Sequence, residues 1–327
     1  MKFRTLCVGA VLAAVSTFAA AQGTPEASFP SRPIRMIAPS SSGGPVDVMA
    51  RVVAQGLSEV LGQQVVVDNR AGAAGLIGAE LVATAIPDGY TIMFGFSGPL
   101  VIVPHLGGKT PYNTLKDFAP VSFAIQGPYI LLVRPSLPVN SVKDLIAAAK
   151  QQPGKLNYAS GGNGTGIHLA GELFKMTAGV NIVHVPYKGA GPGMTALLAN
   201  EVDMMFNGLA PAIPHVKSGK LKGLAVGGTK RSTLLPELPT VAEASGLDFN
   251  TTGWYGILAP ARTPRAIVMK LHAATVKALA TPAVRDTLAR QGVESVGSTP
   301  EEFAKLIRDE WSKWEKVIKT AGLKGQT

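Results

Sequence analysis

The sequence contains one cysteine, Cys7, and few aromatic or charged residues, which make up 6% and 16% of its 327 positions. Cys7 lies in an N-terminal segment that we expect to be removed, so the mature chain would contain no cysteine. This excludes disulfide bonds, thiolate metal sites and cysteine nucleophiles. The residues before it, Arg4-Thr5-Leu6, also differ from a lipoprotein site, where a small residue is expected directly before the lipidated cysteine.

The chain has no long apolar run after its first residues. At the N-terminus, Lys2 and Arg4 precede an apolar stretch at residues 6–21, and Ala19-Ala20-Ala21 has the small-residue pattern of a signal cleavage site. The stretch is shorter than the roughly 20 residues that a membrane-spanning helix needs, and no basic cluster follows it. We therefore predict that residues 1–21 are a secretory signal peptide and that the mature protein is periplasmic.

The sequence also lacks a basic cluster of the kind that binds nucleic acid. Removal of Lys2 and Arg4 takes the formal net charge from +10 to +8, but the remaining basic residues are scattered. They form no Lys/Arg run and do not alternate with stacking aromatic residues, so we expect no nucleic-acid partner. A positive surface does raise the local concentration of small anions.

Two nucleotide-binding motifs are incomplete. Gly108-Lys109-Thr110 ends like a Walker loop, but the first glycine of that motif would fall at Val103. The pair Gly162 and Gly164 lacks a third glycine, because Ile167 stands at that position. We therefore expect no nucleotide cofactor, and no other cofactor is indicated.

Catalytic and metal-binding patterns are equally sparse. Ser97 lies in the segment 95–99, which lacks the last glycine of a nucleophile elbow. We expect none of the five histidines to form a metal site with an acidic residue. No pair of acidic residues indicates acid–base catalysis. We predict that the protein is not an enzyme and holds no metal; the alternative from another class is an exported hydrolase that uses Ser97 or His168.

Glycine and proline are plentiful, at 37 and 24 residues, and they separate short apolar runs from helical patterns. Strands that alternate with helices indicate an α/β protein with parallel sheets covered on both faces. The first series has strands at 34–39, 65–67 and 90–94 and a helix at 47–61. The second has strands at 130–133, 156–160, 182–186, 203–206 and 221–226 and helices at 141–150 and 167–177.

The two series predict two lobes. The segment after Pro264 is mostly helical, and we expect it to return to the first lobe through crossovers near 121–133 and 251–258. The predicted division is residues 22–124 with 253–327 in lobe 1, and 125–252 in lobe 2.

One glycine-rich loop in each lobe follows a strand and opens a helix. These loops, at 39–44 and 161–166, expose backbone N–H groups at a positive helix end, which suits a carboxylate or phosphate. Thr165 is the expected N-cap of the second helix, and Asp47 the expected support of the first loop. His168 either bonds the second loop or contacts the ligand. The alternative is that the glycines only permit turns.

These loops belong to a longer set of segments through which the chain resembles the substrate-binding proteins of tripartite tricarboxylate transporters, also called the Bug family. The likeness covers essentially the whole mature chain. It rests on residues 30–34, 43–47 with Arg51, 67–70 with Gly72 and Gly75, 87–91, 116–121, 156–160, 162–165, 168–174, 184–189, 239–243 and 297–303.

The resemblance implies a two-lobed periplasmic-binding-protein fold, similar to type II, with a ligand cleft between the lobes. It also implies a small organic carboxylate as ligand, held by both loops partly through ordered waters, and a membrane permease with a large and a small subunit as partner. A monomer suits a protein that must diffuse to a permease. An exported sensor that signals to a membrane kinase is an alternative of the same class.

On the same basis, Ser41, Gly43, Ser160, Gly161, Gly162 and Thr165 would hold the carboxylate, and the loop 96–103 with Asn207 would shape the far end. With Gly44, Ser97 and His168 from these segments, the predicted ligand-binding set is Ser41, Gly43, Gly44, Ser97, Ser160, Gly161, Gly162, Thr165, His168 and Asn207.

The sequence departs from the family pattern at that far end. The family usually has a Ser/Thr-rich segment at 96–99 and an asparagine near 103, where this chain has Phe96-Ser97-Gly98-Pro99 and Val103. Many members have Asp in place of Asn207 and Phe in place of Ser40. Because a second buried carboxylate is costly without donors, we predict a ligand with one carboxylate and a less polar remainder.

Overall fold

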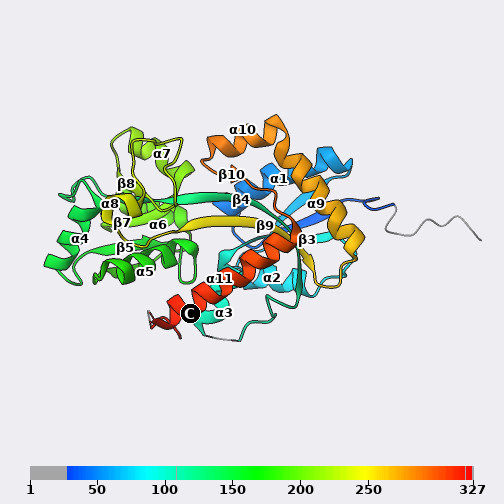
Figure 1. Cartoon of the computed structure of the whole chain (residues 1–327), viewed down its shortest axis with the longest axis horizontal. Helices are drawn as coiled ribbons and strands as arrows, with labels where there is room; N and C mark the ends of the chain where they lie inside the picture. The colour runs from blue at the N-terminus through cyan, green and yellow to red at the C-terminus, as the bar shows by residue number, and fades with distance from the viewer. Residues whose placement is uncertain (1–27, 108, 321, 326–327) are drawn as a thin grey trace, which may run out of the picture.

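Two long strands join the two lobes of the molecule in the computed structural model (Figure 1). They are β4 (Phe118–Val133) and β9 (Thr252–Pro260), which lie antiparallel to each other. The structure describes residues 28–107, 109–320 and 322–325. The predicted signal peptide and Cys7 lie outside the described residues.

Lobe 1 is built on the strand order β2-β1-β3-β9-β4. Its first three strands are parallel, and β9 is antiparallel to β3. The elements are β1 (Ile34–Ala38), α1 (Pro45–Leu61), β2 (Val65–Asn69), η1 (Ala73–Gly75), α2 (Leu76–Ala83), β3 (Thr91–Phe96), η2 (Gly98–Ile102), α3 (Val103–Leu106), α9 (Arg265–Ala280), α10 (Pro282–Arg290), β10 (Glu294–Ser295) and α11 (Pro300–Thr320).

Lobe 2 repeats this plan around the far half of β4. β5 lies parallel to β6 and β7, whereas β4 is antiparallel to β7 and β8. The elements are α4 (Val142–Gln151), β5 (Asn157–Ser160), α5 (Gly166–Ala178), β6 (Val183–Pro186), α6 (Ala190–Leu198), β7 (Met204–Gly208), α7 (Leu209–Lys217), β8 (Lys222–Val226) and α8 (Val241–Ser245).

The alternating pattern therefore gives the α/β fold and its two lobes, but the predicted parallel pairing holds only for strands outside the crossovers. Both crossover strands run antiparallel to their neighbours, because each carries the chain from one lobe into the other. The short strand predicted at 130–133 is the last quarter of the 16-residue β4. Local hydrophobic patterning could not show that one strand serves two sheets.

Separate hydrophobic cores support the two lobes. One cluster of buried side chains draws its members from Ile130 to Phe249, while the two other clusters are made mostly by residues of lobe 1. Leu169 of α5 is an exception, since it packs in the same cluster as Trp254 and Phe303 of lobe 1. The two lobes therefore touch through α5 in this structure.

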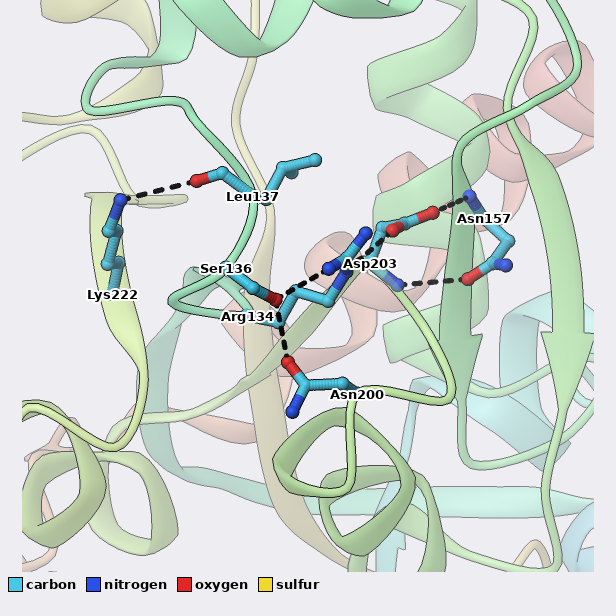
Figure 2. Close-up of polar contacts among 7 residues, drawn as sticks. All are labelled: Arg134, Ser136, Leu137, Asn157, Asn200, Asp203 and Lys222. Atoms are coloured by element: carbon cyan, nitrogen blue, oxygen red, sulfur yellow. Dashed lines mark hydrogen bonds and ion pairs between the residues drawn. The ribbon is translucent and has the colours of Figure 1, made fainter.

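A polar cluster stabilises the end of lobe 2 where β4 finishes and β5 and β7 begin (Figure 2). The Arg134 guanidinium lies 2.8 Å from Asp203 Oδ1, and Asp203 Oδ2 accepts a 2.9 Å bond from the Asn157 N–H. The Asn157 side-chain oxygen in turn accepts a hydrogen bond from the Asp203 N–H. Lys222 Nζ donates to the carbonyl oxygens of Leu137 and Val139. The charged groups of Arg134, Asp203 and Lys222 therefore all contact the ends of these strands and the adjoining loop.

The C-terminal helices pack on lobe 1. α9 and α10 contribute buried side chains to the core beneath α1, and Trp314 of α11 is buried. No single helix in the described part of the chain is long and apolar enough to cross a membrane. Only α9 and α10 together have the required length and composition, with a bend of 69° between them.

Candidate ligand-binding site

A cleft of about 720 Å³ opens between the lobes where the loops after β1 and β5 meet the crossover strands. Lys188 is the one charged side chain on its walls, and no aspartate or glutamate lines it among the described residues. The lining residues are 39–46, 71–75, Phe96, Ser97, Tyr129, Gly161, 165–167, 188–192, Asn207, Gly208 and 253–255.

In lobe 1, a carboxylate of the protein already occupies the start of the α1 helix. Asp47 Oδ2 accepts a 2.8 Å hydrogen bond from the Gly43 N–H, and Asp47 Oδ1 lies 2.9 Å from Arg51 Nη2. Burial alone would raise the pKa of Asp47, but the Gly43 and Arg51 contacts outweigh it and hold the pKa below its usual value. Asp47 is therefore ionised and neutralises much of the positive end of α1.

In lobe 2, side chains bond the glycine-rich loop from behind. Ser160 Oγ accepts from the Gly162 N–H at 3.0 Å, and Thr165 Oγ1 caps α5 by accepting from the His168 N–H at 3.3 Å. His168 Nδ1 accepts from the Gly164 N–H at 3.2 Å, and the His168 side chain is 1% exposed. Of the two roles considered for His168, the structure shows the bond to the loop.

A buried array of titratable groups lies beneath this loop. The His168 and His184 rings stack with centroids 4.1 Å apart, and Tyr158 stacks on the other side of His184. The Tyr158 hydroxyl donates to Glu172, whose two oxygens also accept from Lys175. Burial, together with the positive charge of Lys175, lowers the pKa of each histidine to about 4, so both rings are neutral at pH 7.

The N-terminus of α5 differs from that of α1 because no acidic residue occupies its first turn. Gly166 and Ile167 are the first two helical residues, and their N–H groups have no intrahelical acceptor. Both residues line the cleft. The helix end in lobe 2 can therefore receive an anion directly, whereas the negative charge of Asp47 already lies in the first turn of α1 in lobe 1.

The structure brings seven of the ten predicted positions to the cleft. Ser160, Gly162 and His168 lie behind the loop instead, where they position its backbone. The seven that line the cleft are Ser41, Gly43, Gly44, Ser97, Gly161, Thr165 and Asn207.

Several lining residues carried no sequence signal. Tyr129 and Tyr255 come from the crossover strands, which local patterning treated only as strands. The segment 71–75 also lines the cleft, and Ala73 and Ala74 within it have φ values of +46° and +53°, where residues with a side chain are strained. Glycines 72 and 75 on either side were the available signal for an unusual backbone here.

The comparisons with known proteins agree with this geometry. The model of the tripartite tricarboxylate transporter family receptor matches residues 49–323. The chain belongs to this family. Among relatives of this receptor, BugT of Bordetella pertussis (strain Tohama I) is 38% identical over 298 residues, 91% of each chain. A protein from the tcbD-tcbE intergenic region of Pseudomonas sp. (strain P51) is 41% identical over 292 residues, 89% of this chain and 87% of its own length.

Solved structures place the receptor in the same group. Rpa4515 of R. palustris with adipate has a TM-score of 0.84 and 37% identity, covering 90% of this chain and 98% of its own. MatC (Rpa3494) from Rhodopseudomonas palustris with bound malate has a TM-score of 0.81 and 33% identity, covering 89% and 100%. The periplasmic binding protein BugD gives 0.83 and 34%. The family and the two-lobed binding fold predicted from the sequence are thereby confirmed.

Proposed function

We propose that this receptor captures a small organic carboxylate in the interlobe cleft, in the periplasm, and delivers it to a permease with a large and a small membrane subunit, without catalysing a reaction. Membership of the receptor family supports this role. So do the similar proteins whose structures contain adipate and malate, both of which are carboxylates.

The N-terminus of α5, whose first turn carries no acidic residue, is the single observation that carries the proposal. Its N–H groups at Gly166 and Ile167 open into a cleft that no acidic side chain lines among the described residues. A carboxylate there would replace the water that otherwise solvates those N–H groups and would gain from the helix dipole. The loop at 39–44 faces the same cleft from lobe 1 and would close over the bound ligand.

Closure requires a hinge, and we place it in β4 and β9, with lobe 1 formed by 22–124 and 253–327 and lobe 2 by 125–252. Only these two strands join the lobes among the described residues, and the separate cores allow each lobe to move as a unit. A ligand that contacts both loops favours the closed arrangement by its higher affinity for that state.

The rest of the cleft suits a mostly apolar ligand body. Phe96, Trp254, Val46 and the alanines of segment 71–75 form much of the wall, and the Asn207 oxygen is already bonded to the Gly208 N–H at 2.8 Å. Among the described lining residues, Lys188 is the one charged side chain that a second carboxylate could contact. We therefore retain a ligand with one carboxylate and a less polar remainder.

A thermal-shift screen of protein that has been unfolded and refolded, to remove carried-over ligand, tests the function. Adipate, malate, citrate and benzoate serve as carboxylate probes, with benzamide as the uncharged counterpart of benzoate. A ligand at 100 times its Kd stabilises the folded state by about 2.7 kcal/mol, which moves the melting temperature measurably. A shift with a carboxylate and none with benzamide supports the proposal, and a shift larger for citrate than for benzoate contradicts the ligand class. No shift with any of the four contradicts carboxylate binding.

A further inference from the structure

The hydroxyl of Tyr129 lies against the first residue of α5. Tyr129 belongs to β4 and pairs with Gly208 across the sheet, so its ring comes from the crossover itself. A methyl group at Gly166 would overlap the Tyr129 hydroxyl, and one at Gly253 would lie 3.0 Å from it. Glycines on both sides therefore leave space for this hydroxyl at the helix end.

Ser97 places a second hydroxyl at the same point. Its side chain is 7% exposed, and its Oγ lies 3.6 Å from the position that a Cβ on Gly166 would take. Ser97 follows directly after β3 in lobe 1, whereas Gly166 belongs to lobe 2. Neither Ser97 Oγ nor Tyr129 Oη has a hydrogen-bond partner among the described residues, although both groups line the cleft.

Ser97 is buried and Tyr129 is half-buried, and hydroxyl groups in such positions normally have a partner in the folded protein. Burial raises the pKa of Tyr129 far above its usual value, so the hydroxyl keeps its proton and can donate it. The other polar side chains of the loop are committed elsewhere, since Ser160, Thr165 and His168 all bond the loop backbone. A partner for Tyr129 and Ser97 must therefore come from the contents of the cleft.

We propose that Tyr129 and Ser97 donate hydrogen bonds to the ligand carboxylate at the N-terminus of α5, together with the N–H groups of Gly166 and Ile167. This assignment rests on the proposed function and specifies its site. Two amides and two hydroxyls supply four donors, and an ionised carboxylate has about four lone-pair positions on its two oxygens. The four donors match a carboxylate and no more.

The number of hydrogen-bond donors favours a carboxylate over an amide at this site. A primary amide offers one acceptor oxygen and brings two donors of its own, so it leaves at least one protein donor unpaired. Tyr129 also lies on a strand that joins the lobes, and Ser97 and Gly166 come from different lobes. A carboxylate bound here therefore bridges both lobes and the hinge at once.

Tyr129→Phe and Ser97→Ala test the inference, each measured by isothermal titration with whichever of adipate, malate or benzoate binds the wild-type protein. Hydrogen bonds to charged groups are strong enough that each loss should weaken binding about 10- to 100-fold. Tyr187→Phe is the control, because it deletes the same hydroxyl from lobe 2 at a position that does not line the cleft. Melting temperatures of the ligand-free variants, compared with wild type, separate lost contacts from lost folding.

Both variants should fold with melting temperatures near that of the wild type, while Tyr187→Phe should bind with unchanged affinity. Unchanged binding by Tyr129→Phe and Ser97→Ala, with the wild type binding normally, overturns the inference and leaves the proposed function standing. If the wild type binds none of the three probes and shows no thermal shift with citrate, the proposed function fails and this inference fails with it.

Discussion

Ser160 Oγ lies 2.6 Å from His184 Nε2, and this contact joins the end of β5 to β6 directly beneath the glycine-rich loop. The same oxygen accepts the Gly162 N–H at 3.0 Å. Ser160 is fully buried, so a single hydroxyl fixes both the loop backbone and the histidine ring behind it. Ser160 thus positions the binding loop without lining the cleft.

Ser160→Ala should therefore destabilise the protein. It leaves the Gly162 N–H and the His184 ring nitrogen without their partner, and an unsatisfied buried group costs about 1–3 kcal/mol. Urea unfolding should show a lower midpoint with an unchanged slope. Ser218→Ala is the matched control, since that hydroxyl bonds a carbonyl on the exposed end of α7. Equal midpoints for the two variants would contradict this role for Ser160.

The two stacked histidines predict a loss of stability in acid. Their pKa is about 4 in the folded protein and about 6.5 when unfolded, so the unfolded state binds more protons between these values. The free energy of unfolding should be largest above pH 6.5 and fall toward pH 4, by up to about 1.4 kcal/mol per pH unit for each histidine. Protonation of His168 also removes the acceptor for the Gly164 N–H.

Urea unfolding between pH 4 and pH 8 measures this dependence. The groups that face the histidine pair are Tyr158, Glu172 and Lys175, which remain in every variant. His184→Gln should reduce the slope between pH 4 and pH 6.5 because one of the two titrating rings is gone. A His184→Gln slope equal to that of the wild type would contradict the assignment.

The sequence predicted the positions of the binding loops and of the helix caps. It did not predict the tertiary contacts that surround the loops. A hydroxyl directly before a helical pattern predicts an N-cap at Ser141, Thr165, Thr281 and Thr299, and the hydroxyls of Ser141, Thr165 and Thr299 do accept hydrogen bonds from the first turn of their helices. Thr281 also occupies the N-cap position of α10, but its hydroxyl donates backward to the Ala278 carbonyl instead of bonding the first turn.

Long-range geometry accounts for the remaining differences. Tyr129 and Gly166 are 37 positions apart in the sequence, and only the antiparallel course of β4 brings the ring to the helix end. Asp47 was expected to support its loop, and it does so through the Gly43 N–H, but the sequence did not predict its ion pair with Arg51. Both facts depend on tertiary contacts that hydrophobic periodicity does not encode.

Gly166→Ala should reduce both stability and binding, because its methyl group would overlap the Tyr129 hydroxyl. The double variant Gly166→Ala/Tyr129→Phe removes that hydroxyl, and the nearest ring carbon, Cζ, then lies 3.2 Å from the methyl group. We expect the double variant to regain most of the lost melting temperature without regaining affinity. Additive losses of melting temperature in the double-mutant cycle would contradict direct contact between the two residues.

A substitution at Gly164 can distinguish an effect on closure of the lobes from an effect on the stability of the glycine-rich loop. A Cβ at this position would lie 2.9 Å from both Val103 Cγ2 and Leu106 Cδ1 of α3 in lobe 1, and its φ of +74° disfavours a side chain. Gly179, which ends α5, has a φ of +61° and no atom within 4 Å of its Cβ position, so Gly179→Ala reports the backbone cost alone. Both alanine variants should lose about 1 kcal/mol of stability from that cost. Only Gly164→Ala should also hold the lobes apart. Small-angle X-ray scattering in the presence of ligand would detect this as a larger radius of gyration, and isothermal titration would detect it as weaker binding. Equal radii and affinities for the two variants would show that the contact between the loop and α3 is not part of closure.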